Sequence, residues 1–327
     1  MKDNKKKNRI FDCFTFYNEI ELLDLRLNVL NDYVDNFVLV EATKTQKGEE
    51  KELFYEKNKH LFEKFNNKII HVVLSEYPNE LTQWTIENIQ RNTIMQGLKN
   101  CQDDDIILIS DLDEIPKPEF IKKYYDRNKI IAFDMNCFYF YLNLYSYNRT
   151  WRQGTKMLSY SNLKNILNEV DFVNSNESKY LDLKYNNNTT PCKIRLYNGD
   201  LQKHVKNAGW HFSYMGGVKK AVQKIQSICE GSLDTKSTDI INMINNKIFY
   251  EQILLPVKID NNFPKYLLKN QEKFTSFIYN KQRRRFWNLY FLKALFKVSK
   301  IINLPNEIAE ILNKIELKNE DNIKWVK

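Results

Sequence analysis

The chain has 327 residues, 43% of them hydrophobic and 13% aromatic, which excludes a disordered protein and suffices for one large domain or two. The formal charge of +9 favours an anionic partner such as nucleic acid, an anionic membrane surface or a phosphorylated substrate. No apolar run approaches the roughly 20 residues of a spanning helix. The five cysteines lack zinc-site spacing, so we expect reduced thiols and a cytoplasmic protein.

The first part of the chain alternates predicted strands and helices. After a basic tail at residues 1–9, too short and too interrupted to lead a signal peptide, apolar runs predict strands at residues 9–16, 37–41, 68–74 and 105–111. Segments with partial helical periodicity predict helices at residues 22–30, 53–65 and 85–98. Strands joined by helical crossovers lie parallel, so this pattern is typical of a nucleotide-binding α/β half.

The most informative stretch is DIILISDLDEIP at residues 105–116. Its continuous apolar run indicates a strand covered on both faces, and Pro116 and Pro118 stop the strand from continuing. Asp111 and Asp113 follow at the carboxyl end, where α/β sheets bind ligands. Alternation points both carboxylates the same way, which suits a shared divalent cation. A solvated acidic turn is the alternative.

Glycine is scarce, with eight in the whole chain. Neither G-x-G-x-x-G nor a Walker loop is present. A nucleotide bound at this sheet would therefore need a metal to hold its phosphates.

The middle of the chain changes character. Residues 130–144 predict one or two strands, interrupted by Asp134 and Asn136, and residues 193–197 predict another strand. Residues 174–190 are asparagine-rich and predict an exposed loop. Five aromatic side chains form either a stacking floor for a sugar ring or plain core; they are Tyr139, Tyr141, Tyr145, Tyr147 and Trp151.

The stretch GWHFSYMGG at residues 209–217 precedes an amphipathic helical pattern. Gly216 and Gly217 open that helix and can offer free N–H groups to a phosphate. His211 suits a metal as a neutral imidazole or contacts a diphosphate. A hydrogen-bonded structural histidine is the alternative.

Residues 261–327 form a basic region with a helical pattern. Residues 281–302 join basic side chains to an apolar stripe, which predicts either an amphipathic helix on an anionic membrane surface or packing on the catalytic domain. No recognised nucleic-acid module accompanies the charge, so we expect no nucleic-acid partner.

These segments together resemble glycosyltransferase family 17. The resemblance is carried by FDCFTFYNEIELLDLRLNVL, NFVLVEATKTQKG, ENIQRNTIMQGL, DDIILISDLDEIPKPEFI and AGWHFSYMGG, in this order over residues 10–230. It implies a GT-A-like fold, a nucleotide-sugar donor, which we take to be a UDP-sugar, and inversion at the anomeric carbon. It also implies a divalent cation, Mn²⁺ or Mg²⁺, and a glycan or glycoconjugate acceptor, with N-acetylglucosamine as a candidate sugar.

The resemblance also implies roles for single residues. The D-x-D element carries metal binding onto Asp111 and Asp113, and the GWH match favours His211 as a further ligand. GT-A analogy places further residues near the nucleotide: Phe16, Asn18, Glu19, Arg91 and Asn92. For the catalytic base we place Glu230, an acidic position shared with the family, ahead of Asp134, which interrupts an apolar strand.

The expected fold is a GT-A-like α/β domain at residues 10–260, with a single Rossmann-type mixed sheet flanked by helices and a basic helical extension. The leading function is a metal-dependent inverting glycosyltransferase. One alternative is a phosphatase of the haloacid-dehalogenase type, which expects D-x-D near the N-terminus with Thr or Val where Ile115 stands. Another is a catalytically silent carbohydrate- or membrane-binding protein of the same fold.

Overall fold

A computed structural model describes residues 8–77, 83–165, 191–227, 236–250 and 252–280. The described residues up to Ile278 belong to one compact unit. The basic segment 281–302 and Glu230 lie outside the described residues. Among the described helices, none combines the length and the apolar character needed to cross a bilayer.

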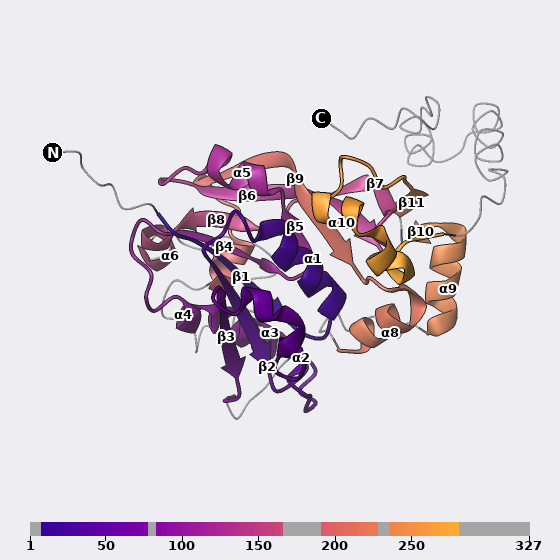
Figure 1. Cartoon of the computed structure of the whole chain (residues 1–327), viewed down its shortest axis with the longest axis horizontal. Helices are drawn as coiled ribbons and strands as arrows, with labels where there is room; N and C mark the ends of the chain where they lie inside the picture. Colours follow the sequence, from indigo (N-terminus) through magenta and orange to yellow (C-terminus); the bar gives the residue numbers. More distant parts are fainter. Residues whose placement is uncertain (1–7, 78–82, 166–190, 228–235, 251, 281–327) are drawn as a thin grey trace. The chain divides into compact units, whose positions relative to one another are not determined.

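The first four strands form the parallel half of the sheet, as their sequence pattern predicts. They are β1 (Ile10–Phe16), β2 (Asn36–Ala42), β3 (Ile69–Leu74) and β4 (Ile106–Asp111), in the order β3-β2-β1-β4 (Figure 1). Between them lie α1 (Ile20–Leu30), α2 (Phe54–Asn58), the 3₁₀ helix η1 (Lys59–Phe65), α3 (Gln83–Asn92) and α4 (Ile94–Gly97). The register sets Phe16 beside Glu41 and Thr15 beside Asp111, so three strand ends meet at one edge.

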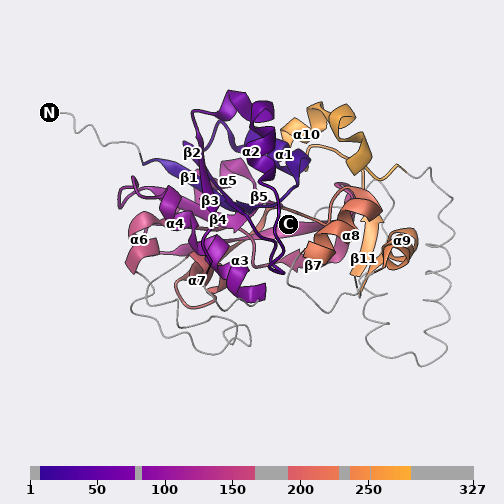
Figure 2. The same ribbon diagram turned by 90° about the horizontal axis from the view of Figure 1, so that it is seen from below.

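Both faces of β1, β2 and β4 are buried, which explains their continuous apolar runs, whereas β3 at the sheet edge leaves Val73 exposed. On one face Phe11, Val38 and Ile107 pack with Ile94 and Leu98. Figure 2 shows α1 and α2 on one side of the parallel strands and α3, α4 and α7 (Pro191–Leu196) on the other. The parallel half is therefore the middle layer of a three-layer arrangement.

The second half of the sheet is mixed and mostly antiparallel. Its strands are β5 (Glu114–Pro116), β6 (Ile130–Tyr139), β7 (Leu144–Trp151), β8 (Lys156–Ser159), β9 (Gln202–Ser213), β10 (Ile248–Phe249) and β11 (Gln252–Pro256). Within the described residues the full order is β10-β11-β7-β6-β8-β4-β1-β2-β3, with β9 running parallel to β6 and antiparallel to β5. The expected mixed α/β sheet is confirmed.

The remaining helices surround this second half. They are α5 (Pro118–Tyr124), α6 (Tyr160–Asn165), α8 (Gly217–Ser227), α9 (Ser237–Asn246), α10 (Lys265–Lys269) and the 3₁₀ helix η4 (Gln271–Phe277). In Figure 1, α8 and α9 lie beside β7, β10 and β11, at the end of the sheet away from β3. The amphipathic helix expected after Gly216 is confirmed as α8.

Two expectations for the middle of the chain resolve in opposite ways. Residues 130–144 contain all of β6 and only the first residue of β7, so the lower of the expected one or two strands is confirmed. The strand expected at residues 193–197 is wrong, because residues 193–196 belong to α7. Tyr139 and Tyr145 are core residues, since Tyr139 packs on Phe249 in a tilted ring contact with centroids 4.5 Å apart and both tyrosines are buried.

Candidate active site

The Asp-Leu-Asp loop joins β4 to β5 at the carboxyl edge of the parallel strands. Asp111 ends β4, and Glu114 begins β5, which pairs with β9. This pairing sets Glu114 opposite His211, and the carbonyl of Asp113 accepts a hydrogen bond of 2.8 Å from the N–H of Phe212. Strand pairing therefore brings the acidic stretch and the GWH stretch of the sequence together.

Arg26 of α1 holds this loop in place through hydrogen bonds to its backbone. Its guanidinium is fully buried, and it pairs with the carboxylate of Asp12 on β1 at 2.6 and 2.8 Å. Its Nη1 also donates hydrogen bonds of 2.9–3.1 Å to three loop carbonyls, those of Asp111, Leu112 and Glu114. Because a guanidinium carries five N–H donors in one plane, a single side chain fixes both the strand and the loop.

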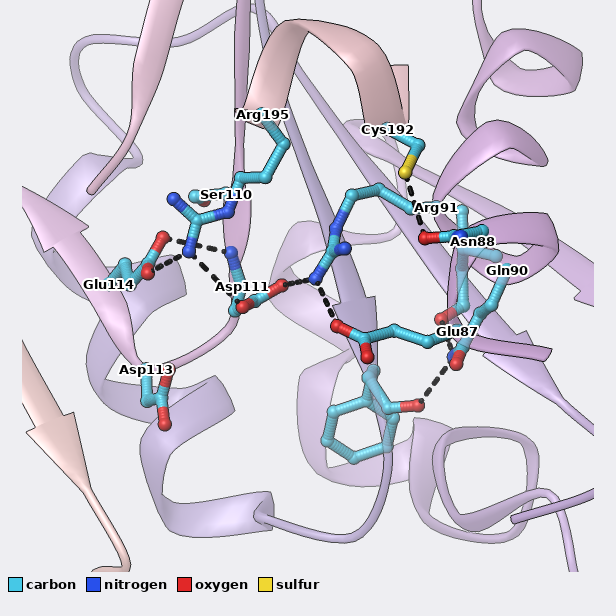
Figure 3. A network of polar contacts seen from close by, with 12 residues as sticks. Glu87, Asn88, Gln90, Arg91, Ser110, Asp111, Asp113, Glu114, Cys192 and Arg195 are labelled. Carbon is cyan, nitrogen blue, oxygen red and sulfur yellow. Dashed lines mark hydrogen bonds and ion pairs between the residues drawn. The ribbon is translucent and has the colours of Figure 1, made fainter. Parts of the chain in front are cut away.

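Two further arginines hold the carboxylate of Asp111 (Figure 3). Arg91 of α3 donates to Oδ1 at 2.8 Å, and Arg195 of α7 donates to Oδ2 at 3.3 Å. Burial alone raises the pKa of Asp111, but the two guanidinium groups outweigh burial and hold this pKa well below its usual range. Asp111 is therefore an anion fixed between two helices.

Glu114 completes this arrangement as a buried carboxylate. It contacts the guanidinium of Arg195, accepts a 2.5 Å hydrogen bond from the indole N–H of Trp151, and accepts the backbone N–H of Asp111 at 3.2 Å. Burial raises the pKa of Glu114 to about 7, although Arg195 acts in the opposite direction. Figure 3 shows Glu114 and Asp111 on the two sides of Arg195, with Asp113 pointing away from them.

Asp113 belongs to a different set of contacts. The ammonium of Lys224 on α8 lies 2.7 Å from its Oδ2 and 3.0 Å from Oε1 of Glu19, the residue before α1. Burial lowers the pKa of Lys224, but the two carboxylates outweigh this effect and raise the pKa well above its ordinary value. Lys224 is therefore charged and shared by two carboxylates.

His211 lies on the other side of Asp113. Its Nε2 is 3.7 Å from Oδ1 of Asp113, and its ring stacks on Trp151 with centroids 4.7 Å apart. Its Nδ1 is buried and has no hydrogen-bond partner among the described residues. Burial lowers the pKa of His211 to about 4, so the imidazole is neutral at pH 7 and keeps a lone pair that a metal can use.

Asp111, Asp113, His211 and Lys224 line one cleft of about 210 Å³ at the carboxyl edge of the sheet, whereas Arg26, Glu114 and Arg195 do not. Tyr17, Lys44 and Lys51 line it on the β1–β2 side, and Trp151, Tyr214 and Ser227 line it on the side of β7 and α8. The cleft mixes aromatic surfaces with charges of both signs. That lining suits a ligand with a flat ring and an anionic group.

The structure gathers six of the residues proposed from the sequence at this cleft: Phe16, Glu19, Arg91, Asp111, Asp113 and His211. Asn18 and Asn92 do not line it, and the side chain of Asn92 instead accepts the backbone N–H of Cys192 at 3.0 Å. Asp134 also lies off the cleft, where its carboxylate is 2.6 Å from Nδ1 of His204. Trp151 is the one member of the five proposed aromatic residues that lines this cleft.

Gly216 and Gly217 adopt positive φ angles of 93° and 75° at the turn where α8 begins. Both N–H groups donate to the carbonyl of Phe140 at 3.1 Å. Neither N–H is therefore available to a phosphate in this arrangement. The structure thus contradicts the expectation that these two N–H groups bind an anion.

Four residues of the site had no role in the sequence analysis: Arg26, Glu114, Arg195 and Lys224. Only Arg26 carries a local signal, because it interrupts the buried leucine stripe of α1. A buried arginine needs an anionic partner, and that requirement points to a buried carboxylate nearby.

The donor atoms present fit a divalent cation with two protein ligands. Oδ1 of Asp113 and Nε2 of His211 are 3.7 Å apart, a gap that one cation bonded to each at about 2.1 Å can span. Both oxygens of Asp111 instead face guanidinium groups. Within the described residues no cluster of three His, Cys, Asp or Glu side chains forms a metal site, so the remaining ligands would be phosphate and water oxygens.

A family model identifies the chain. The model described as glycosyltransferase family 17 matches residues 1–284, which include every strand and helix described above. The chain belongs to glycosyltransferase family 17. The GT-A-like fold expected from the resemblance accords with the mixed sheet and its flanking helices.

Three curated relatives carry the name beta-1,4-mannosyl-glycoprotein 4-beta-N-acetylglucosaminyltransferase. The rat protein is 27% identical over 307 residues, which cover 84% of this chain and 55% of the relative. The mouse protein is 26% identical over the same coverage, and the human protein is 27% identical over 298 residues, or 81% and 54% of the two chains. This family 17 chain thus spans about half the length of the relatives that it matches. The phosphatase alternative and the silent binding protein find no support in these comparisons.

Proposed function

We propose that this chain is an inverting glycosyltransferase. It moves a sugar, with N-acetylglucosamine as the first candidate, from a UDP-sugar donor to a hydroxyl group of a glycan or glycoconjugate. Family membership supports sugar transfer, and the names of the relatives support this sugar. The observation that carries the proposal is the cleft at the carboxyl edge of the sheet, where Asp113, His211 and Lys224 lie side by side.

The chemistry is a single displacement. The acceptor oxygen attacks the anomeric carbon of the donor, and the bond from that carbon to the diphosphate oxygen breaks. The electron pair of this bond stays on the diphosphate, and the proton of the acceptor hydroxyl moves to a carboxylate base. The negative charge that develops on the diphosphate is the charge the protein must stabilise.

The carboxylates that line the cleft are poor candidates for the base. Within the described residues they are Glu19, Glu87, Asp111 and Asp113, and each lies within 3.3 Å of an arginine or lysine nitrogen. Such pairing favours the ionised form and lowers basicity. Asp134 contacts His204 and not the cleft. Glu230 therefore remains our proposed base.

We further propose Mn²⁺ or Mg²⁺ as a cofactor held by Asp113 and His211. When bound, such a cation offsets the negative charge of the leaving diphosphate. The supporting observations are the 3.7 Å gap between the two ligand atoms and the depressed pKa of His211. Arg91 and Arg195 keep Asp111 in place at the same loop, where its exposed face is suited to a ribose hydroxyl.

The decisive experiment is a thermal-shift and hydrolysis panel on the purified chain. The ligands are UDP-GlcNAc, UDP-GalNAc, UDP-glucose and GDP-mannose, each with Mn²⁺ and with EDTA. We expect UDP-GlcNAc with Mn²⁺ to raise the melting temperature and to release UDP slowly, because donors are hydrolysed when water replaces the acceptor. NMR of the anomeric proton in the product then reports inversion.

The panel also separates the competing functions. Release of inorganic phosphate from p-nitrophenyl phosphate without any nucleotide would replace transfer by phosphomonoester hydrolysis. Stabilisation by glycans but by no nucleotide sugar would indicate a binding protein. Asp103→Asn is the matched control for substitutions at Asp113, because Asp103 is an exposed aspartate paired with Lys164, away from the cleft.

A further inference from the structure

Lys224 is the side chain of α8 that faces the Asp-Leu-Asp loop. It lies one turn before Ser227, which also lines the cleft. Its ammonium bridges Asp113 and Glu19, and so joins three elements that are distant in the sequence. An ammonium has three N–H donors, and the two carboxylates use two of them. The third has no acceptor among the described residues.

The other cations that line the cleft have contacts of their own, and Lys44 pairs with the exposed Glu50 at 3.3 Å. Arg91 is fixed by Asp111 at 2.8 Å and by Glu87 at 2.9 Å. Lys51 lies over the rings of Tyr17 and Phe54, at 5.4 and 5.7 Å from their centroids. Among the basic side chains of the cleft, Lys224 lies nearest to Asp113. Asp113 is the carboxylate proposed to hold the metal ion of the donor complex.

The flexibility of a lysine adds to this position. Its ammonium sits on a four-carbon stem and makes single contacts, so it can exchange one acceptor for another without moving the helix. About one fifth of the Lys224 side chain is exposed, at 19%, so an acceptor can approach it from the cleft. Asp113 and Glu19 together carry one more negative charge than Lys224 neutralises. Electrostatic attraction therefore keeps the ammonium near the two carboxylates without fixing the directions of its hydrogen bonds.

We infer that Lys224 is a binding residue for the diphosphate of the sugar donor, where its ammonium contacts phosphate oxygen and stabilises the leaving group. This inference rests on the proposed function. It also supplies from α8 the anion contact that the bonded N–H groups of Gly216 and Gly217 do not offer. The role is distinct from that of Asp113 and His211, because Lys224 contacts the phosphates and not the cation.

The test compares two ligands that differ only in the diphosphate. Dissociation constants of UDP and uridine are measured by calorimetry for the wild type and for Lys224→Gln, in the presence of Mn²⁺. We expect the variant to lose roughly 10- to 100-fold in affinity for UDP, the range for a hydrogen bond to a charged group. Its affinity for uridine should stay within about twofold of the wild type, since uridine has no phosphate.

Lys220→Gln is the matched control. Lys220 lies one turn earlier on α8 and pairs with Glu21 of α1 at 2.6 Å, so it shares the residue type, the helix and the kind of partner. It does not line the cleft. The control should bind both ligands as the wild type does. A purely structural role for Lys224 would lower the affinities for UDP and uridine together.

A second variant decides the question if Lys224→Gln does not fold. Glu19→Gln removes one of the two carboxylates that compete for the ammonium, and it should raise the ratio of UDP to uridine affinity severalfold. An unchanged ratio in the folded variants overturns the inference while leaving a nucleotide-dependent enzyme. Failure of the wild-type chain to bind either UDP or uridine would instead overturn the UDP-sugar donor on which the inference rests.

Discussion

Two regions of the site hold their carboxylates in different ways. One is an arginine framework, in which Arg26, Arg91 and Arg195 bind Asp12, Asp111 and Glu114 respectively, and of which Arg91 and Asp111 reach the wall of the cleft. The other is a lysine cluster at the cleft, made of Glu19, Asp113 and Lys224. Each guanidinium reaches several acceptors in fixed directions, whereas the ammonium is a point charge on a flexible stem. The framework therefore sets the geometry of the site, and the lysine cluster is the part able to exchange partners.

Removing the centre of the framework should have the largest effect. Arg26→Met leaves Asp12 as a buried unpaired charge and leaves three loop carbonyls without their donor. We expect the free energy of unfolding to fall by about 3–5 kcal/mol, the cost of breaking a buried ion pair, as measured by urea denaturation. Lys164→Met, which breaks the exposed pair with Asp103, is the control and should change nothing measurable. Equal stability of the two variants would refute the framework.

The two aspartates of the loop should respond differently to the same substitution. Asp113→Asn should abolish the stabilisation that Mn²⁺ and UDP give together, and leave the melting temperature of the protein alone near that of the wild type. Asp111→Asn should lower the unfolding free energy by about 1 kcal/mol, because two guanidinium groups lose an anion that is one-third exposed, at 34%. Thermal shifts with and without ligand measure both effects. The contrast between the regions disappears if the two variants behave alike.

Lys156 gives a smaller effect, which depends on pH. Its ammonium is buried on β8 and contacts the carbonyl of Tyr197 and the side-chain oxygen of Gln202, so it lacks the paired carboxylates of Lys224. Burial lowers its pKa from 10.5 to about 7. Between these values the unfolded chain binds the extra proton, so this residue makes the unfolding free energy rise with pH.

The Lys156→Met variant isolates this contribution. Its unfolding free energy should increase less between about pH 7 and pH 10 than that of the wild type. The difference between the two slopes against pH should approach the value for one bound proton. Below pH 7 the two slopes should coincide, because the lysine is then protonated in both the folded and the unfolded chain. Parallel stability profiles across the whole range would show that Lys156 keeps its charge in the fold.

The parallel half of the fold follows from the sequence, since a strand covered on both faces needs a continuous apolar run. The position of Asp111 and Asp113 follows as well, because carboxyl ends of parallel strands meet at one edge. The arginines and lysines that pair with these carboxylates cannot be predicted from the sequence in this way. Nothing in the sequence around Lys224 or Arg195 distinguishes these two among the 50 lysines and arginines of the chain, because each gains its role from a carboxylate that only the tertiary fold brings close.

The error at α7 shows the same limit at a functional position. Cys192, Ile194 and Leu196 alternate with basic residues, which suggests a half-exposed strand. Pro191 begins the helix, a position where proline is favoured because its missing N–H costs nothing there. In the helix, Ile194 and Arg195 are both buried, and Arg195 reaches Asp111. A strand would have sent these two neighbours to opposite faces.

The pairing of β9 with β5 and β6 determines when this site exists during folding. The four parallel strands are complete by residue 111, but His211 reaches the loop only when β9 hydrogen-bonds along Ile130–Tyr139 and Glu114–Pro116. Contacts of such long sequence separation form late, because closing the intervening loop costs entropy first. During synthesis, the growing chain therefore carries the acidic loop well before it carries the histidine and lysine that face it. Until β9 docks, the nascent protein has a sheet edge with an unpaired carboxylate and no active centre.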